Sequence, residues 1–337
     1  MFAASPNTRE TWLKVFALIC GIFIGCLYAS FGRSAAKSWF GSSNTQFTTV
    51  EPITEKPEIN ETAQFLVSDD TTIANALAQK VRVLCWVHNN NPEKEQIDAI
   101  QKTWGVRCTK FIVIKKSGGN STDSFNIPND RNSSSNIENA YRFIFDNYAT
   151  KFDWFLKTTG SSYVVMENLR YKLFPYNPTD AIGIGLALKN GKYNLSYLSE
   201  KAGYVLSTKA LEMLIKAFDK QGDISLAEEI HNDELRIAMF LDFVEVPFAA
   251  NNDTDDKQLF FDKHLDEFFL PNPNVTFPYP WYQDYKVNHY LDHASNYSIA
   301  FCDISWQHMF VMEFLIYQLR PYGLETKHPP LPELNQH

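Results

Sequence analysis

The spacing of apolar residues changes several times along the chain, and each change indicates a different kind of segment. The run from Val15 to Phe31 holds 17 residues without a charge. As a helix it would span roughly 25 Å, enough for the apolar core of a bilayer. Residues 32–80 are rich in Ser, Thr, Glu and Pro and show little apolar periodicity. The pattern predicts a cytosolic tail over residues 1–14, a transmembrane signal-anchor over 15–31 and a stem over 32–80, with a cleaved signal peptide as the alternative to the anchor.

From Val81 the pattern alternates between buried strands and amphipathic helices. The predicted strands cover residues 81–87, 110–116 and 152–159, and the predicted helices cover residues 95–104 and 136–149. This order predicts an α/β fold with an open, mostly parallel sheet and right-handed crossovers. Such sheets bind ligands beyond the carboxyl ends of their strands, so we look for chemistry at residues 158–162. Residues 117–135 show no apolar pattern and are predicted to form a loop.

The second half of the chain has a more mixed pattern. The predicted strands are residues 181–188 and 202–207, and the predicted helices are residues 208–218 and 232–243. A strongly apolar C-terminal helix over residues 308–319 is expected to pack on the core. We therefore predict one globular domain over residues 81–325, with a mixed second subregion, followed by a short tail over 326–337.

The charge balance argues against one class of partner. The chain carries 31 Lys and Arg against 39 Asp and Glu, a formal net charge of −8, whereas nucleic-acid binding requires a basic surface. Hydrophobic residues at 45% and charged residues at 21% exclude global disorder. The Cys count of 5 is too low for a disulfide scaffold but permits one or two bridges.

Several N-x-S/T sequons follow the apolar segment, and none precedes it. They begin at Asn60, Asn120, Asn132, Asn194, Asn252, Asn274 and Asn296. Together they predict surface loops that receive N-glycans in a lumenal domain. The expected topology is the single-pass type II arrangement, with a short cytosolic tail, one membrane span and a large lumenal part that permits disulfides.

Five strings between Val81 and Gly323 carry a family resemblance. They read LCWV, KTWGVRC, DWFLK…YVVMENLRY, AGYVLSTKAL and YQLRPYG. Together they resemble the core 1 β1,3-galactosyltransferase family, including its enzymatically silent chaperone branch. The resemblance implies a glycosyltransferase A-type fold and a membrane protein of the secretory pathway, in the Golgi for enzymes and in the endoplasmic reticulum for the chaperone branch. For active members it implies transfer of galactose from UDP-galactose to GalNAc on Ser or Thr, with Mn²⁺ and inversion of the anomeric centre.

The chain departs from this family where a divalent metal is expected. The family reads close to WFLKADDDTYV, whereas this chain reads WFLKTTGSSYV, so Thr159, Gly160 and Ser161 stand in place of three Asp. Near the C-terminus the family reads close to CCSDLAVSFH and this chain reads HASNYSIAFC, so Cys302 replaces the metal-binding His. Neutral hydroxyls supply no charge to offset Mn²⁺, and we expect no metal site and no cofactor. Cys302 is then either a buried small apolar residue or a free reactive thiol.

Other residues of the expected nucleotide-sugar region are mixed. The family's SGGAGYVLS is replaced by SEKAGYVLS, which places Glu200 and Lys201 where glycines are expected. The resemblance implies an acidic base near the start of the predicted helix 232–243, and Asp233 is the best remaining candidate. The alternative is a solvated carboxylate at a helix start. Lys157 and Lys201 are candidates for a cationic substitute that holds a diphosphate without a metal.

The resemblance also implies a disulfide bond between Cys85 and Cys108, which lie at the end of the first predicted strand and after the following helix. Closing a loop of that length should stabilise the fold by ~3 kcal/mol. Two reduced, buried thiols are the alternative.

Three functions are compatible with these observations. The first is a catalytically impaired pseudo-glycosyltransferase in mucin-type O-glycosylation, with a chaperone-like or regulatory role toward a partner such as an active paralogous galactosyltransferase. The second is an active enzyme that uses UDP-galactose and a GalNAc-glycoprotein with little or no metal. The third is a lectin-like binder that uses the sugar-binding pocket of the resembled family without catalysing transfer. A homodimer or a heterodimer is compatible with each of them.

Overall fold

The computed structural model describes residues 71–88, 94–116, 124–127, 136–220, 222, 224, 230–269, 293–324 and 331. The chain divides into two units, residues 1–68 and 69–337, and all described residues belong to the second. The predicted cytosolic tail, the signal-anchor and most of the stem therefore lie outside the described residues. Within the described part, no helix combines the length and the apolar character that crossing a bilayer requires.

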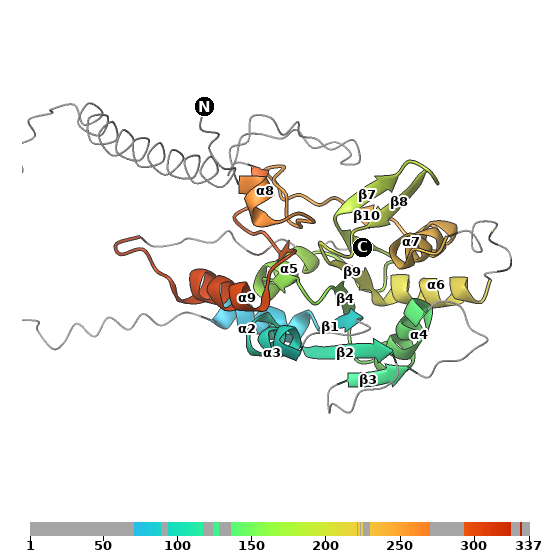
Figure 1. Ribbon diagram of the computed structural model, residues 1–337, viewed down its shortest axis with the longest axis horizontal. Helices are drawn as coiled ribbons and strands as arrows, with labels where there is room; N and C mark the ends of the chain where they lie inside the picture. Colours follow the sequence, from blue (N-terminus) through green and yellow to red (C-terminus); the bar gives the residue numbers. More distant parts are fainter. Residues whose placement is uncertain are drawn as a thin grey trace, which may run out of the picture. The chain divides into compact units, whose positions relative to one another are not determined.

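The core is built on a seven-stranded mixed sheet (Figure 1). Its strands are β1 (Val83–His88), β2 (Lys110–Lys116), β3 (Ser124–Ile127), β4 (Trp154–Thr158), β6 (Gly183–Gly185), β9 (Tyr204–Ser207) and β10 (Phe248–Ala249). They lie in the order β3-β2-β1-β4-β9-β6-β10, in which β9 runs antiparallel to both neighbours and the other pairs are parallel. The prediction of an α/β fold with a mostly parallel sheet is confirmed.

Helices and two short two-stranded sheets complete the described part. The helices are α2 (Thr72–Lys80), α3 (Lys94–Lys102), α4 (Asn136–Tyr148), α5 (Met166–Leu173), α6 (Thr208–Phe218), α7 (Asp233–Phe243), α8 (Leu265–Phe269) and α9 (Trp306–Glu313). A 3-10 turn, η1 (Trp104–Arg107), follows α3, and a π-helical turn, η4 (Phe314–Gln318), continues α9. The small sheets pair β5 (Tyr163–Val164) with β11 (Ala300–Phe301), and β7 (Ala187–Asn190) with β8 (Leu195–Leu198).

Alternate residues of β1 pack into two separate core clusters, each of which contains residues of different helices. Val83, Cys85 and Val87 pack in the core cluster that contains residues of α3, α5 and α9. Leu84 and Trp86 pack in the cluster that contains residues of α4, α6 and α7. Because successive side chains of a strand point to opposite faces, a strand covered on both faces has to be apolar throughout. This is why residues 83–87, after the exposed Arg82, form an unbroken apolar run.

Two segments differ from their predicted form. Strand β3 lies inside residues 117–135, the predicted loop, and pairs with β2 at the edge of the sheet. Edge pairing rests on backbone hydrogen bonds, so it leaves no apolar pattern in the sequence. Helix α2 lies inside the predicted stem, where Leu77 is buried and the helix contacts α5. The compact unit therefore begins before the predicted boundary at Val81, because a single buried residue gives too little periodicity to reveal a helix.

The C-terminal helix is less deeply docked than predicted. In α9 only Met309 is buried, whereas Phe310 is 43% exposed and Val311 is 47% exposed. Trp306 and Met312 are partly buried against the core, and Glu313 forms an ion pair with Arg107. The apolar run in the sequence therefore reflects only in part the packing of this helix against the described core.

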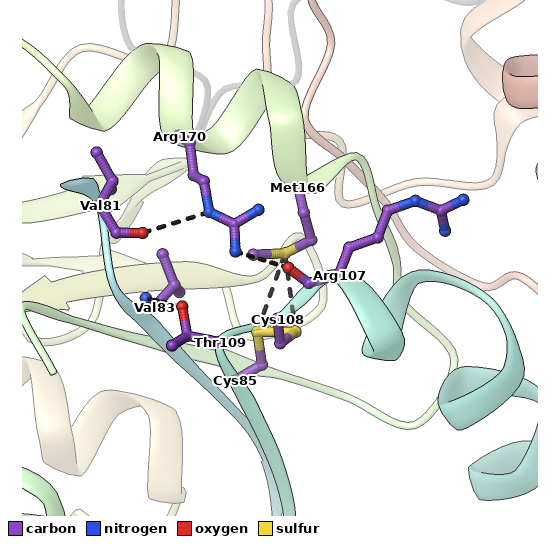
Figure 2. The surroundings of a disulfide bond; sticks show 8 residues. All are labelled: Val81, Val83, Cys85, Arg107, Cys108, Thr109, Met166 and Arg170. Atoms are coloured by element: carbon purple, nitrogen blue, oxygen red, sulfur yellow. Dashed lines mark hydrogen bonds between the residues drawn. A yellow bond between two sulfur atoms is a disulfide. The ribbon is translucent and has the colours of Figure 1, made fainter. Parts of the chain in front are cut away.

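A disulfide bond joins Cys85 of β1 to Cys108, as the family resemblance implies. Met166 of α5 places its Sδ atom 3.9 Å from both Sγ atoms (Figure 2). Arg170 of the same helix donates a hydrogen bond from Nη2 to the carbonyl of Arg107 at 2.6 Å. The disulfide thus lies in the buried layer between β1 and α5, next to the residues that fix that helix.

We expect the Cys85→Ser/Cys108→Ser double variant to lose about 3 kcal/mol of unfolding free energy, because the bond closes a loop with a sequence separation of 23. Urea unfolding of the full-length chain under non-reducing conditions measures the loss. Cys302→Ser is the control, since it removes a free buried thiol and no bridge. A double variant as stable as the native chain would contradict a structural role for the bond.

Candidate functional site

A hollow lies at the carboxyl end of β4. Its walls come from the loop after β4, the segment before β9 and the start of α7. Because β9 runs antiparallel to β4, the segment that precedes β9 lies over the point where β4 ends. The hollow measures about 440 Å³, and its wall is formed by Thr159, Glu200, Lys201, His231, Asn232, Asp233 and Glu234. Three residues predicted from the sequence, Thr159, Lys201 and Asp233, therefore meet in one place. Their meeting point is the edge of the sheet at which a ligand is expected.

The turn before β9 depends on a glycine. Gly203 has a φ of +78° and its N–H donates to the carbonyl of Glu200 at 3.1 Å. A Cβ at this position would lie 3.2 Å from Cγ2 of Thr158. The left-handed backbone and this close approach both favour glycine, and they let the segment of Glu200 and Lys201 fold across the end of β4.

The hydroxyls of the loop after β4, residues 159–162, form hydrogen bonds with one another. The Oγ1 atom of Thr159 lies 3.2 Å from Oγ of Ser161 and 2.9 Å from Oγ of Ser162. The backbone N–H of Thr159 also donates to Oγ of Ser162 at 3.2 Å. These contacts give the loop a closed hydrogen-bond pattern with no net negative charge on its side chains.

The two segments in which the resemblance implies metal ligands lie side by side. The N–H of Ile304, two residues after Cys302, donates to the carbonyl of Ser161 at 2.8 Å. Gln96 joins them again, since its Nε2 donates to the carbonyls of Gly160 at 2.6 Å and Ile304 at 3.1 Å. The sequence changes at residues 159–161 and at Cys302 thus fall in one region of the fold.

Cys302 is buried, as the first of its two interpretations expects. Burial, with a further contribution from the neighbouring Asp303 carboxylate, raises the pKa of the Cys302 thiol well above its usual range. The thiol therefore stays protonated at neutral pH, and a protonated thiol is a poor nucleophile.

The residues at the end of β4 do not fit the divalent metal that the resemblance implies. Thr159, Gly160 and Ser161 contribute no carboxylate, and Cys302 contributes a neutral thiol. Across the described part of the chain, no three His, Cys, Asp or Glu side chains come close enough together to hold a metal ion. Since Mn²⁺ prefers anionic oxygen and imidazole ligands, the donor set present here is a poor match.

Lys157 is buried beneath the hollow rather than exposed in it. It is 1% exposed, forms an ion pair with Glu200, and places Nζ 5.4 Å from the centre of the Trp86 ring. Register explains the position, because Trp86 of β1 and Tyr204 of β9 are its cross-strand neighbours. Its charge is already compensated by Glu200. Lys201, which is exposed on the wall of the hollow, is the better placed of the two predicted cations.

Two further carboxylates face the hollow at the start of α7. Asp233 follows the N-cap Asn232, whose Oδ1 accepts a hydrogen bond from the N–H of Leu235 at 2.9 Å. Glu234 accepts a hydrogen bond from the N–H of Glu200 at 2.6 Å. Burial raises the pKa of both Asp233 and Glu234. A raised pKa makes a carboxylate a stronger base, so Asp233 is more than a fully solvated charge at a helix end.

His88 belongs to the same region, although the sequence reasoning did not single it out. It ends β1, and Lys157 and Glu200 are the charges that act on it. Burial first, and the Lys157 charge second, lower the pKa of His88 to about 4. Its position in the sequence could have indicated it, because His88 is the first polar residue after the buried run of the first strand.

We expect the stability of the chain to fall as the pH drops from about 6.5 to about 4, in part through His88. The unfolded imidazole has a pKa of about 6.5, and the folded one has a pKa of about 4, so between these values the unfolded state binds the extra proton. The loss is on the order of 3 kcal/mol. Urea unfolding of the native chain and of His88→Gln at several pH values isolates the effect. An identical pH dependence in both chains would contradict it.

The sequons in the described residues lie at or near the surface. Asn194 and Asn296 are exposed, and Asn252 is partly exposed. Asn194 sits between β7 and β8 with a positive φ of 49°, a conformation that Asn tolerates in turns. The other predicted sequons, Asn60, Asn120, Asn132 and Asn274, lie outside the described residues.

No protein-family model matches the chain. A curated protein from Xenopus laevis, glycoprotein-N-acetylgalactosamine 3-beta-galactosyltransferase 1, is 25% identical over 294 residues, which cover 81% of this chain and 76% of that protein. A solved structure of a glycosyltransferase involved in the glycosylation of the major capsid of PBCV-1 matches 50% of this chain and 79% of its own, with a TM-score of 0.31 and 14% sequence identity. By sequence, the chain is thus similar to a core 1 β1,3-galactosyltransferase over most of its length, which indicates a galactosyltransferase-like glycosyltransferase.

Proposed function

We propose that this chain is a galactosyltransferase-like protein that has lost metal-dependent transfer and acts as a chaperone-like or regulatory partner in mucin-type O-glycosylation. The sequence similarity to a glycoprotein-N-acetylgalactosamine 3-beta-galactosyltransferase supports the galactosyltransferase part. The proposal includes the type II topology, with the anchor at residues 15–31 and the compact unit in the lumen of the Golgi or the endoplasmic reticulum.

One observation carries the proposed loss of activity. The loop at the end of β4 and the segment of Cys302 lie side by side, and the positions at which the resemblance implies metal ligands, residues 159–161 and Cys302, carry no carboxylate or imidazole. In an inverting transfer the leaving UDP gains one negative charge on its β-phosphate oxygen, and a divalent metal would stabilise that charge by several kcal/mol. A deficit of ~4 kcal/mol already slows a reaction about 10³-fold. Two independent changes at one place therefore support a severe impairment.

The proposed partners follow from the same fold. A protein that keeps the fold but not the metal ligands still presents the surfaces of a galactosyltransferase, so an active paralogue is the partner that we propose. UDP-sugars and GalNAc-glycoproteins are proposed as weak ligands of the hollow, where Lys201 and Asp233 lie. Such a protein could bind a UDP-sugar or a GalNAc-glycoprotein and assist or regulate another enzyme without catalysing transfer itself.

The decisive assay supplies the full-length chain, in detergent, with UDP-galactose and a GalNAc-peptide, with and without Mn²⁺. We expect no turnover above about one thousandth of an ordinary glycosyltransferase rate under either condition. Turnover at an ordinary rate that depends on Mn²⁺ would overturn the proposal. Co-purification of the native chain with an active galactosyltransferase tests the partner role separately.

The exposed position of Lys201 favours a second candidate function, a metal-independent transferase. Lys201 and the candidate base Asp233 share the wall of the hollow, so a cation and a carboxylate face the same space. This function predicts turnover without Mn²⁺ that Lys201→Ala abolishes and that Lys220→Ala, a change at an exposed lysine outside the hollow, leaves intact.

A further inference from the structure

A second hollow lies on another part of the compact unit. It measures about 620 Å³ and is formed by the end of α5, the segment 250–259 and residues 296 and 297. None of its lining residues lines the hollow at the end of β4. Its volume is within the range of small-molecule sites in proteins, and nothing in the proposed function uses it.

One wall of this hollow is aromatic. Tyr171, Tyr176 and Tyr297 line it, and each is partly exposed. The rings of Tyr171 and Tyr297 lie 5.6 Å apart at an interplanar angle of 40°. Among the described residues, their hydroxyls have no hydrogen-bond partner. A partly exposed tyrosine wall with available hydroxyls suits a ligand that has both an apolar face and polar edges.

Polar groups that line the same hollow are held in place. Lys172 donates from Nζ to the carbonyl of Asn252 at 3.0 Å, which leaves donors of its ammonium available. Asp253 accepts hydrogen bonds from the N–H groups of Asp255 and Lys257, each at 2.9 Å, and so fixes the loop. The cations and acceptors of the hollow are therefore preorganised, which lowers the entropic cost of binding.

Two sequons meet at this hollow although they are far apart in the sequence. Asn252 and Asn296 both line it, and so does Thr254 of the first sequon. A glycan attached to either Asn would therefore start at the hollow itself. The position of the two sequons is independent of the tyrosine wall, and both observations point to a carbohydrate ligand.

We infer that this hollow is a saccharide-binding site, in which the Tyr171 and Tyr297 rings pack against a pyranose face and Lys172 donates to its hydroxyls. The saccharide has two possible sources, an N-glycan carried by the chain at Asn252 or Asn296, and a glycan carried by another molecule. Both present a pyranose with an apolar C–H face and hydroxyl edges. The inference stands apart from the proposed function, because it involves none of the residues at the end of β4.

The test uses the full-length chain, produced without N-glycosylation and purified in detergent. Calorimetry measures binding of two probes, N,N′-diacetylchitobiose, which is the base of every N-glycan, and a GalNAc-threonine glycopeptide. We expect at least one probe to bind and Tyr297→Ala to weaken it about tenfold, as the loss of an aromatic platform predicts. Tyr297→Phe should keep the affinity, because it keeps the ring. Tyr322→Ala is the matched control, since Tyr322 is fully exposed and lies outside the hollow.

A glycosylated preparation separates the two sources. If the chain's own glycan fills the hollow, the glycosylated chain binds neither probe, and Asn252→Gln/Asn296→Gln restores binding. If the ligand is carried by another molecule, the glycosylated chain binds as the unglycosylated one does. Either result supports the site. Failure of both probes to bind the unglycosylated chain, or equal binding by Tyr297→Ala, would overturn it.

Discussion

Replacing Glu200 by Gln is expected to destabilise the folded chain by about 3 kcal/mol, the lower part of the range for breaking a buried ion pair. Lys157 is 1% exposed and Glu200 forms its ion pair, so the substitution leaves a buried ammonium without that partner, and the charges of Asp233 and Glu234 act on it only at longer range. The Glu200 side chain is 25% exposed, and water can reach that side of the pair, which is why the upper part of the range is not expected.

Urea unfolding of the full-length chain measures this loss, and two controls define it. Glu267→Gln makes the same chemical change at an exposed position of α8 and should shift the stability by less than about 0.5 kcal/mol. Lys157→Met/Glu200→Gln removes both charges and should recover most of the loss. A Glu200→Gln variant within 1 kcal/mol (roughly the mean effect of any substitution) of the native chain would refute the pairing.

The second large effect is a gain of metal binding. We expect the triple variant Thr159→Asp/Ser161→Asp/Cys302→His to bind Mn²⁺ with a Kd of about 10⁻⁴ M, as weakly coordinating oxygen sites do. The reason is geometric, since the Ser161 carbonyl accepts from Ile304, two residues after Cys302, so the new side chains start from adjacent backbone. Thr159 and Ser161 are also partly exposed, so the added carboxylates can remain charged.

Isothermal calorimetry with MnCl₂ measures this gain. The matched control is Thr159→Asn/Ser161→Asn/Cys302→His, which has the same shape without the two negative charges and should not bind. Far-ultraviolet circular dichroism checks that both variants are folded. If the charged variant binds no more Mn²⁺ than the neutral one, the absence of carboxylates at residues 159 and 161 does not explain why the native chain lacks a metal site.

The central strands of the sheet are predictable from the sequence because a strand buried on both faces has an apolar residue at every position. The run from Val83 to Val87 alternates between two helix layers, so every position is apolar. Strand β3 and helix α2 are harder to predict from the sequence. Strand β3 pairs through backbone hydrogen bonds at the edge of the sheet, and helix α2 buries one residue, Leu77.

The site was predictable only where the resemblance named a position. Thr159, Lys201 and Asp233 were named and meet in one hollow. The burial of Lys157 could not be predicted, because a lysine in a core strand depends on a partner from a distant segment, here Glu200. His88 was missed for a different reason, since a single His after a strand carries no spacing signal.

We propose that the end of β4 cannot hold a divalent cation beside a sugar nucleotide. Calorimetric titration of the native full-length chain with MnCl₂, with and without UDP, measures this capacity. We expect no saturable Mn²⁺ binding in either titration. Tight Mn²⁺ binding, with UDP affinity that rises when the metal is present, would refute the proposal.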